Sequence, residues 1–487
     1  MSEAPGETAR RFHELTKHSY ESVRLNRHYL DWQNQPIPFK IYRDVASTPL
    51  PPVSEPDGMS ALAALRPTPA APRATPLGPA DLSRLLFQAA GVTKRIHYGG
   101  GQEMLFRAAA CTGALYHIEI YVVKEDGVFH YDPREHALDH LRTGDWRRTL
   151  VEATGDDERV ASAEAVLALT TTYWRNAWKY QSRAYRHAFW DGGTILAHVL
   201  AMARALGIRA QLVPFFADPE LERLLDIDPE EEGVVTLVSL GTSNQPLPPT
   251  PGSPEPLRLE TVPLSRSRVD YPLIVEMHRD SSLESGADAR ALREAPAPGK
   301  RHETSPGIEA AFDEPLESVI RRRGSARRFE RRPIDAAALT SILEATTLDA
   351  MLGDLYVIAN EVDGLARGTY VHGDTGLTLL KEGDFRKEAG YLDLGQPLAA
   401  DAAANVYVLT DLEPVLARYG DRGYRIAALE GGLLGGRLYL AAYAWKLGAT
   451  GLTFYDDAVT EFFSPHARGK SVMFLVAMGV RGKRPRL

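Results

Sequence analysis

The chain has 487 residues, a formal net charge of -8, 44% apolar residues and 25% charged residues, which is ordinary for a globular protein and argues against nucleic-acid binding. Its single cysteine, Cys111, excludes an intrachain disulfide and a cysteine-rich metal site, and it favours a reducing cytoplasm. The N-terminus lacks the apolar core of a signal peptide, and no run of about 18 apolar residues predicts a membrane span.

The first part of the chain predicts an extension, a linker and then a globular region. Residues 1–80 comprise a polar, helical stretch around 14–29, an extended segment to 42, and a Pro- and Ala-rich strap from 46. The first globular region is expected at 81–243, with a helix at 82–89, strands at 115–123 and 128–131, a long apolar helix at 191–207 and a last strand at 234–241.

The second part of the chain repeats this order. Residues 244–312 show little periodicity, so we expect a long, partly mobile linker with at most a short strand at 271–276. The second globular region, 313–487, predicts a helix at 335–346, strands near 354–360 and 405–409, a long buried helix at 430–447 and a final strand at 471–480. Such mixed content predicts an α+β, three-layer architecture for each region.

Several landmarks occur twice, 239 positions apart. Tyr131 recurs as Tyr370, the Gly-Asp-aromatic-Arg stretch at 144–147 recurs at 383–386, and the Tyr-Arg pair at 185–186 recurs at 424–425. This period is too long for a solenoid repeat, so it predicts a duplicated domain. Fused copies usually pack as a homodimer does, which predicts an intrachain pseudodimer. Residues that only one copy has are then the place to look for function.

An arginine-rich run in the second copy predicts an anion site. Five arginines lie at 321–328 around Ser325, and a second basic cluster at 481–486 closes the chain. Guanidinium groups and a hydroxyl match the geometry of a phosphate. The alternative is a solvated basic turn with a basic tail. In the comparable place the first copy has only Arg66 and Arg73, so a phosphate site would occur once per chain.

The pattern Arg-x-Ser-x-Arg-x-Phe before a helix, with a final strand ending in Gly-x-Arg, resembles the flavin-dependent nitroreductase family. The resemblance implies FMN at a dimer interface, with each site borrowing residues from the partner. It implies that the FMN phosphate is held by Arg323, Ser325, Arg327, Arg481 and Arg484. It also implies that Thr453 and Phe454 belong to a loop facing the edge of the flavin ring.

In that family, the residues that the partner contributes to each flavin site belong to a segment of small residues before a strand. Here it corresponds to Thr112, Gly113 and Ala114 of the first copy, whereas residues 351–356 of the second copy match poorly. One copy thus keeps the flavin-cradling segment and the other keeps the phosphate motif. The resemblance therefore implies one shared site, and it leaves open whether a weaker second flavin site survives.

Residues 13–42 and the Lys179-Tyr180 pair resemble the SagB/ThcOx-type branch of the family, which oxidises azoline rings in modified peptides. The resemblance implies that Lys179 and Tyr180 are catalytic. A nearby ammonium stabilises a phenolate, so Tyr180 is a candidate base for the proton that leaves the ring carbon. Tyr180 recurs as Tyr419, which is equally compatible with a structural role, but Lys179 is replaced by Arg418.

Three functions remain open. The first interpretation is an FMN-dependent dehydrogenase of peptide azolines. The second is an NAD(P)H-dependent nitro or quinone reductase, and the third is a flavin-free scaffold subunit of a peptide-modifying complex. The substrate would be a peptide or a small molecule, with peptide-modifying proteins as candidate partners and a homodimer of pseudodimers as a candidate assembly.

The remaining polar residues are weaker candidates: His187 for assisting proton transfer, and Cys111 for a thiol near the flavin. The histidines lack the spacing of metal ligands, so no metal is expected. The arginines that recur in both copies, such as Arg183 and Arg422, are expected to be part of the scaffold, because a single active site would not need them twice.

Overall fold

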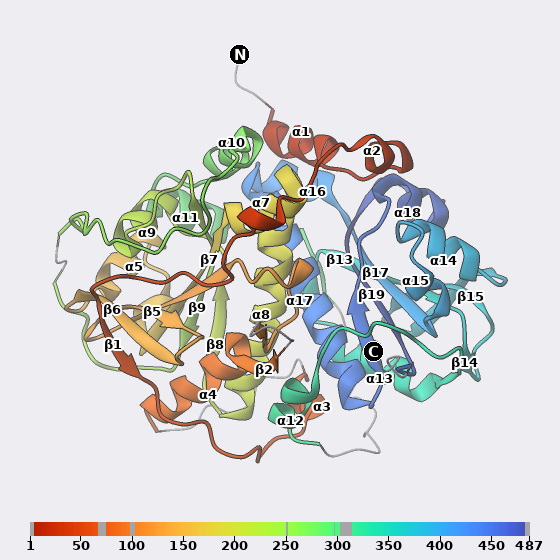
Figure 1. The fold of residues 1–487 in the computed structure, drawn as a ribbon, viewed down its shortest axis with the longest axis horizontal. Coiled ribbons are helices and arrows are strands. Elements are labelled where there is room, and N and C mark those ends of the chain that lie inside the picture. Colours follow the sequence, from red (N-terminus) through yellow and green to blue (C-terminus); the bar gives the residue numbers. More distant parts are fainter. Residues whose placement is uncertain are drawn as a thin grey trace.

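The computed structural model describes residues 4–66, 75–97, 103–249, 252–296, 298–301 and 314–482. Two antiparallel sheets stand on either side of a central helix pair (Figure 1). The first sheet has seven strands in the order β1-β6-β5-β4-β7-β9-β8. Its strands are β1 Ala46–Pro49, β4 Ile118–Lys124, β5 Gly127–Asp132, β6 Ala137–Thr143, β7 Ala165–Thr172, β8 Ala210–Val213 and β9 Glu232–Leu240.

The second sheet has six strands in the order β16-β15-β13-β17-β19-β18. Its strands are β13 Gly353–Ala359, β15 Gly368–Gly373, β16 Gly376–Glu382, β17 Ala404–Asp411, β18 Gly448–Gly451 and β19 Lys470–Gly479. Apart from β1, the two sheets therefore have the same order. Three small pairs complete the strands: β2 Val92–His97 with β3 Glu103–Arg107, β10 Lys300–Arg301 with β12 Ala350–Met351, and β11 Ile334–Asp335 with β14 Val362–Asp363.

Helices form the remaining layers. Those of the first half are α1 Glu7–Leu15, α2 Tyr20–Leu25, α3 Ala61–Ala64, α4 Pro79–Ala90, α5 Arg147–Ala153, α6 Glu158–Ala161, α7 Tyr173–Tyr180, α8 Ala184–Ala205 and α9 Asp218–Leu225. Those that follow are α10 Pro272–Asp280, α11 Gly286–Arg293, α12 Leu316–Arg322, α13 Ala336–Thr346, α14 Arg386–Leu392, α15 Pro397–Asp401, α16 Leu412–Tyr419, α17 Arg422–Ala444 and α18 Asp456–Phe463. Among the described residues, no helix is both long and apolar enough to cross a bilayer.

The central pair, α8 and α17, joins the two halves through glycines. A methyl group at Gly193 would lie 2.4 Å from the carbonyl oxygen of Leu429, and one at Gly432 would lie 2.2 Å from that of Trp190. Only glycine lets the two backbones approach so closely. One continuous apolar core runs from the first half into the second through this contact. The predicted α+β class is confirmed, and the shared strand order of the two sheets agrees with the expected pseudodimer.

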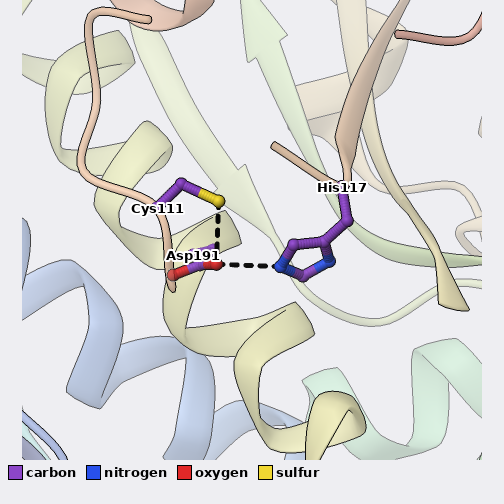
Figure 2. Close-up of side chains that lie close together, drawn as sticks. All are labelled: Cys111, His117 and Asp191. Atoms are coloured by element: carbon purple, nitrogen blue, oxygen red, sulfur yellow. Dashed lines mark hydrogen bonds and ion pairs between the residues drawn. The ribbon is translucent and has the colours of Figure 1, made fainter. Parts of the chain in front are cut away.

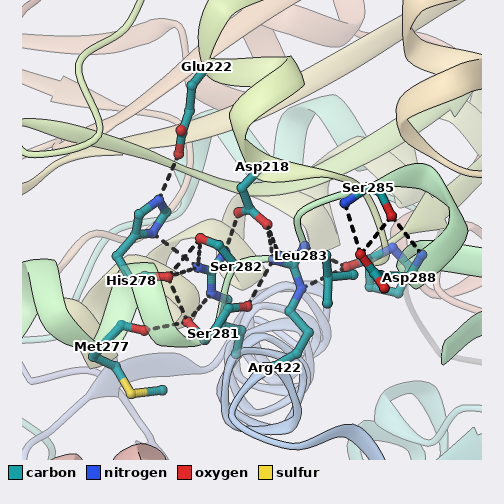
Figure 3. A network of polar contacts seen from close by, with 12 residues as sticks. Asp218, Glu222, Met277, His278, Ser281, Ser282, Leu283, Ser285, Asp288 and Arg422 are labelled. Atoms are coloured by element: carbon teal, nitrogen blue, oxygen red, sulfur yellow. Dashed lines mark hydrogen bonds and ion pairs between the residues drawn. The ribbon is translucent and has the colours of Figure 1, made fainter.

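Buried ion pairs stabilise the interface between the two halves, called the seam below, in a pseudo-symmetric way. Arg183 and Arg186, at the start of α8, contact Asp456 of the other half at 3.0 and 2.6 Å. Arg422 and Arg425, at the start of α17, contact Asp218 of the first half at 2.7 and 2.6 Å. Figure 3 shows Arg422 beside Asp218. The recurring arginines are thus part of the scaffold, as expected.

The segment predicted as a linker contains a second copy of the N-terminal extension. Nε of Arg186 donates to Oγ1 of Thr16, which follows α1, and Nε of Arg425 donates to Oγ of Ser281, which follows α10. The predicted strand at 271–276 is therefore wrong, because this stretch begins α10. Pro272 fits the first helical turn, where a backbone N–H has no partner, and buried residues recur at helical spacing.

Two further sequence expectations are corrected near the N-terminus. The helical stretch expected around 14–29 begins earlier and is divided into two helices, α1 and α2, separated by residues 16–19. The strap beginning at 46 opens with β1, which pairs with β6 and extends the first sheet. Proline suits such an edge strand because it cannot donate to a further neighbour. The domain boundaries at 81–243 and 313–487 stay predictions.

Candidate active site

Asp191 of α8 is the anchor of the predicted flavin-cradling segment. Its carboxylate accepts hydrogen bonds from the backbone N and Oγ1 of Thr112, both at 2.9 Å. It also contacts Sγ of Cys111 at 3.2 Å and Nε2 of His117 at 2.8 Å (Figure 2). Asp191 is only 3% exposed. Four donors on one buried carboxylate hold the segment firmly against α8, because bonds to a charged acceptor are the strong ones.

The backbone of this segment is unusual. Gly113, Ala114 and Tyr116 have φ values of 66°, 54° and 49°. The left-handed region costs a residue with a side chain free energy, so it persists only where the surroundings impose it. A methyl group at Gly113 would lie 2.8 Å from the hydroxyl of Tyr180. Glycine is therefore required for Tyr180 to approach the segment, and the structure brings these two predicted site residues together.

Arg323 crosses the seam. Its Nε donates to the carbonyl oxygen of Ala108 at 2.7 Å, four residues before Thr112. Its guanidinium also lies over the ring of Tyr439, 5.6 Å from the centroid. Burial lowers the pKa of Arg323, although Tyr439 and Tyr116 raise it in part. The phosphate motif of one half and the cradle of the other half thus lie beside one another.

The other predicted phosphate residues lie around Arg323 to different degrees. Oγ of Ser325 contacts the hydroxyl of Tyr439 at 3.2 Å. Arg327 is exposed and lies close enough to Lys179 to lower the pKa of that amine. Arg481 pairs with Phe329 in an isolated bridge, which places it next to the motif. Arg484 lies outside the described residues.

The predicted ring-edge loop contacts α8 and the N-terminal extension. Phe454 is buried, with its ring centroid 5.8 Å from that of Trp190. The guanidinium of Arg183 lies over both rings at 5.5 Å. Oγ1 of Thr453 contacts Nδ1 of His18 at 3.3 Å. Trp190 and Asp191 are neighbours on α8, so this helix links the loop of one half to the cradle of the other.

Lys179 and Tyr180 end α7, and their electrostatics differ from the sequence-based expectation. Burial, with Asp191 and Cys111 nearby, raises the pKa of Tyr180. The expected phenolate is therefore disfavoured. The ammonium of Lys179 lies over the ring, 5.3 Å from its centroid, and the carboxylate of Asp191 opposes a negative charge on the hydroxyl. Burial and Arg327 lower the pKa of Lys179, which favours its neutral amine. Of this pair, Lys179 has the surroundings of a base.

Cys111 and His117 lie close together with Asp191, although their spacing in the sequence did not indicate a cluster of potential metal ligands. Their ligand atoms and that of Asp191 lie within 4.8 Å of one another, an arrangement that could hold a metal. In the structure Cys111 and His117 each hydrogen-bond to Asp191 instead. Burial, followed by Asp191, raises the pKa of the Cys111 thiol. Asp191 was missed as a site residue. The available signal was an acid at the same place in both copies, Asp191 and Glu430, each directly before a shared glycine.

The pseudo-equivalent place in the second half is closed by the chain itself. Glu430 accepts from the backbone N of Leu352 and of Gly353 at 2.8 Å, and burial raises its pKa to about 7. Strand β10 pairs with β12 over this segment. A methyl group at Gly299 would lie 2.9 Å from the carbonyl oxygen of Met351.

Comparisons with known proteins agree with this geometry. Residues 73–242 match the model of the nitroreductase family. A protein of Methanocaldococcus jannaschii assigned as a nitroreductase is 31% identical over 159 residues, which are 31% of this chain and 76% of that protein. The trifolitoxin-processing protein TfxB of Rhizobium leguminosarum bv. trifolii is 30% identical over 168 residues, which are 32% of this chain and 44% of TfxB.

A solved structure extends the likeness to both halves. The crystal structure of a protein from Anabaena variabilis, also assigned as a nitroreductase, superposes with a TM-score of 0.78 at 27% sequence identity. The match covers 98% of this chain and all of that one. The chain belongs to the nitroreductase family and is one of its oxidoreductases.

Proposed function

We propose that the chain is an FMN-dependent oxidoreductase with one FMN at the seam between its halves. The observation that carries the proposal is Arg323, which belongs to the phosphate motif yet donates to Ala108 beside the cradle of the other half. An FMN whose phosphate lay at Arg323, Ser325 and Arg327 would have Thr112, Gly113 and Ala114 within reach of its ring. The remaining phosphate contacts would come from Arg481 and Arg484.

Buried donors without partners fit the ring of such a cofactor. Among the described residues, Nε1 of Trp190 and both Nε and Nη2 of Arg183 are buried and lack hydrogen-bond partners. Buried polar groups are normally paired, so exceptions call for an explanation. A flavin ring offers carbonyl oxygens and ring nitrogens as acceptors. Trp190 and Arg183 both lie against Phe454, which supports a ring at this place.

One FMN per chain is favoured over two. The second place lacks the arginine motif, and strand β10 and Gly299 cover the segment there. Both deficits would have to be overcome for a second flavin to bind.

The reaction that the site supports best is the two-electron oxidation of an azoline ring in a peptide. FMN, when bound, supplies the acceptor for the hydride. The neutral amine of Lys179 takes the proton from the adjacent ring carbon, since its lowered pKa makes the free amine available. The phenol of Tyr180 keeps its proton and orients the substrate by donating a hydrogen bond. The likeness to a trifolitoxin-processing protein supports a peptide as the substrate.

Flavin content tests the cofactor. The purified protein should be yellow with one FMN per chain, and the double variant Arg323→Ala/Arg327→Ala should lose most of the colour. Arg331→Ala is the matched control, because Arg331 pairs with Asp401 at 2.7 Å outside the site. A colourless wild-type protein would leave the scaffold function instead.

Turnover tests the reaction. With added FMN, wild-type protein should oxidise a thiazoline peptide, and Lys179→Gln should reduce turnover while keeping the flavin. The wild-type rate should rise with pH with an apparent pKa below about 10.4, the ordinary value for lysine. NADPH-driven turnover of a nitroarene that is indifferent to Lys179→Gln would instead support the reductase.

A further inference from the structure

A large cavity lies beside the helix that carries Lys179 and Tyr180, apart from the proposed flavin site. It has a volume of about 700 Å³ and lies between α7 and α10, with residues 263–271 closing one side. Ligand pockets typically measure about 300–1,000 Å³ and are lined mainly by apolar and aromatic side chains. Here Tyr173, Trp174 and Tyr271 supply aromatic walls. Both helices lie toward the same end of the molecule (Figure 1).

The pseudo-symmetric place in the other half is sealed. There α16 takes the place of α7, and α1 takes the place of α10. Nε and Nη2 of Arg10 donate to the carboxylate of Glu413 at 2.9 and 2.7 Å across this contact. At its end, Gly6 sits so close to Leu416 that a methyl group would lie 2.7 Å from Cβ of Leu416.

The residues that seal one half are replaced in the other. Trp174 stands where α16 has Glu413, and Val275 stands where α1 has Arg10. An ion pair between the helices has thus become a pair of apolar side chains that line an open space. Ala177 likewise stands where α16 has Leu416. The cavity thus lies in the half that also keeps Lys179, where apolar residues replace the ion pair of the other half.

The charge around the cavity selects its ligand. Its lining includes four carboxylates and two guanidinium groups, namely Glu230, Glu231, Asp270, Glu276, Arg268 and Arg279. Arg268 pairs with Glu231 and with Asp270. Arg11 of α1 pairs with Glu276, and Arg279 pairs with Asp280. Among the described residues Glu230 has no ion pair. The net negative lining disfavours phosphate-bearing ligands such as a nicotinamide dinucleotide, and it favours a cation.

Polar groups are also available within the walls. Nε1 of Trp174 donates to Oγ of Ser265 at 2.8 Å, which fixes the orientation of the indole. Thr172 is 7% exposed and its hydroxyl has no partner among the described residues. A peptide backbone could satisfy such a hydroxyl.

We propose that this cavity binds a peptide segment in which apolar and basic side chains alternate. The apolar side chains pack on Trp174 and Val275, and the basic ones face the carboxylates at the rim. The segment lies along α7, whose last two residues are Lys179 and Tyr180. The site is separate from the flavin, so binding does not depend on the proposed cofactor.

Calorimetry with a defined probe tests the proposal. The probe is a hexapeptide of alternating leucine and lysine with blocked termini, compared with its counterpart that carries glutamate for lysine. Wild-type protein should bind the lysine peptide at least about tenfold more tightly, a difference of about 1.4 kcal/mol. The double variant Trp174→Glu/Val275→Arg rebuilds the ion pair of the sealed half and should weaken binding of the lysine peptide by at least as much.

The controls separate closure of the cavity from damage to the fold. Glu413→Gln changes the sealed side and should leave peptide binding unchanged. Ala177→Leu fills the cavity with the residue that the sealed half carries, so it is the second variant if the first one unfolds. Titrations with and without added FMN should agree, so absence of flavin would refute the proposed cofactor without touching this site. No binding by wild-type protein, equal binding of both peptides, or unchanged binding by the folded closing variants would overturn the proposal.

Discussion

Asp191→Asn should loosen the cradle and weaken FMN binding while the rest of the fold stays intact. The carboxylate now accepts from the backbone N of Thr112, from its Oγ1, from Cys111 and from His117. An asparagine keeps one acceptor oxygen, but its amide group is a donor. The thiol of Cys111 and the ring of His117 can adapt by accepting instead.

The backbone N–H of Thr112 cannot adapt, and this sets the magnitude. Leaving one buried donor without a partner costs about 1–3 kcal/mol, and the other bonds lose the assistance of the charge. We expect a local cost of about 2–4 kcal/mol. If about 2 kcal/mol of this is needed to order the cradle around the flavin, the Kd for FMN rises by roughly 30-fold.

The assay is a titration of apoprotein with FMN, followed by the visible absorbance, together with urea unfolding of each variant. Glu430→Gln is the matched control. Glu430 has a pKa near 7, so the amide mimics a form that is already populated, and its segment is covered by strand β10. An FMN affinity within about twofold of wild type in Asp191→Asn would refute the reasoning, as would an equal loss in Glu430→Gln.

Three further results are expected. Asp218→Asn should lower the free energy of unfolding by about 3–5 kcal/mol, because it leaves the buried guanidinium of Arg422 without its charge partner. Urea unfolding measures this loss. Asp456→Asn should cost a similar amount if the seam is pseudo-symmetric. Burial raises the pKa of the Asp218 carboxyl, but Arg422 and its neighbour on α17 hold it below the ordinary value. Its contribution to stability should therefore be complete above about pH 4 and be lost as the pH falls through the lowered pKa, which acid unfolding of wild type and Asp218→Asn compares. Gly113→Ala adds a methyl group that meets the hydroxyl of Tyr180 at 2.8 Å in left-handed backbone, so turnover should fall by about 100-fold with little change in melting temperature; unchanged turnover would show that Tyr180 need not approach Gly113.

Local patterns in the sequence were sufficient for the scaffold. The 239-residue repeat predicted two similar units, and apolar periodicity located most strands and the two long helices. The family resemblance rested on the spacing around Ser325, which is a local feature as well. The strand predicted at 271–276 was wrong, because a short apolar run fits a buried strand or one turn of a helix equally well.

The sequence by itself predicted two unlike copies of one unit, with an arginine motif in the second alone. It could not determine which residues of the two copies meet, because contacts across the seam depend on how α8 and α17 pack. That packing places Arg323 beside Ala108 and Asp191 beneath Thr112. It also moved the pKa of Lys179 down and that of Tyr180 up, since burial and distant neighbours act on both groups in addition to their adjacency in the chain.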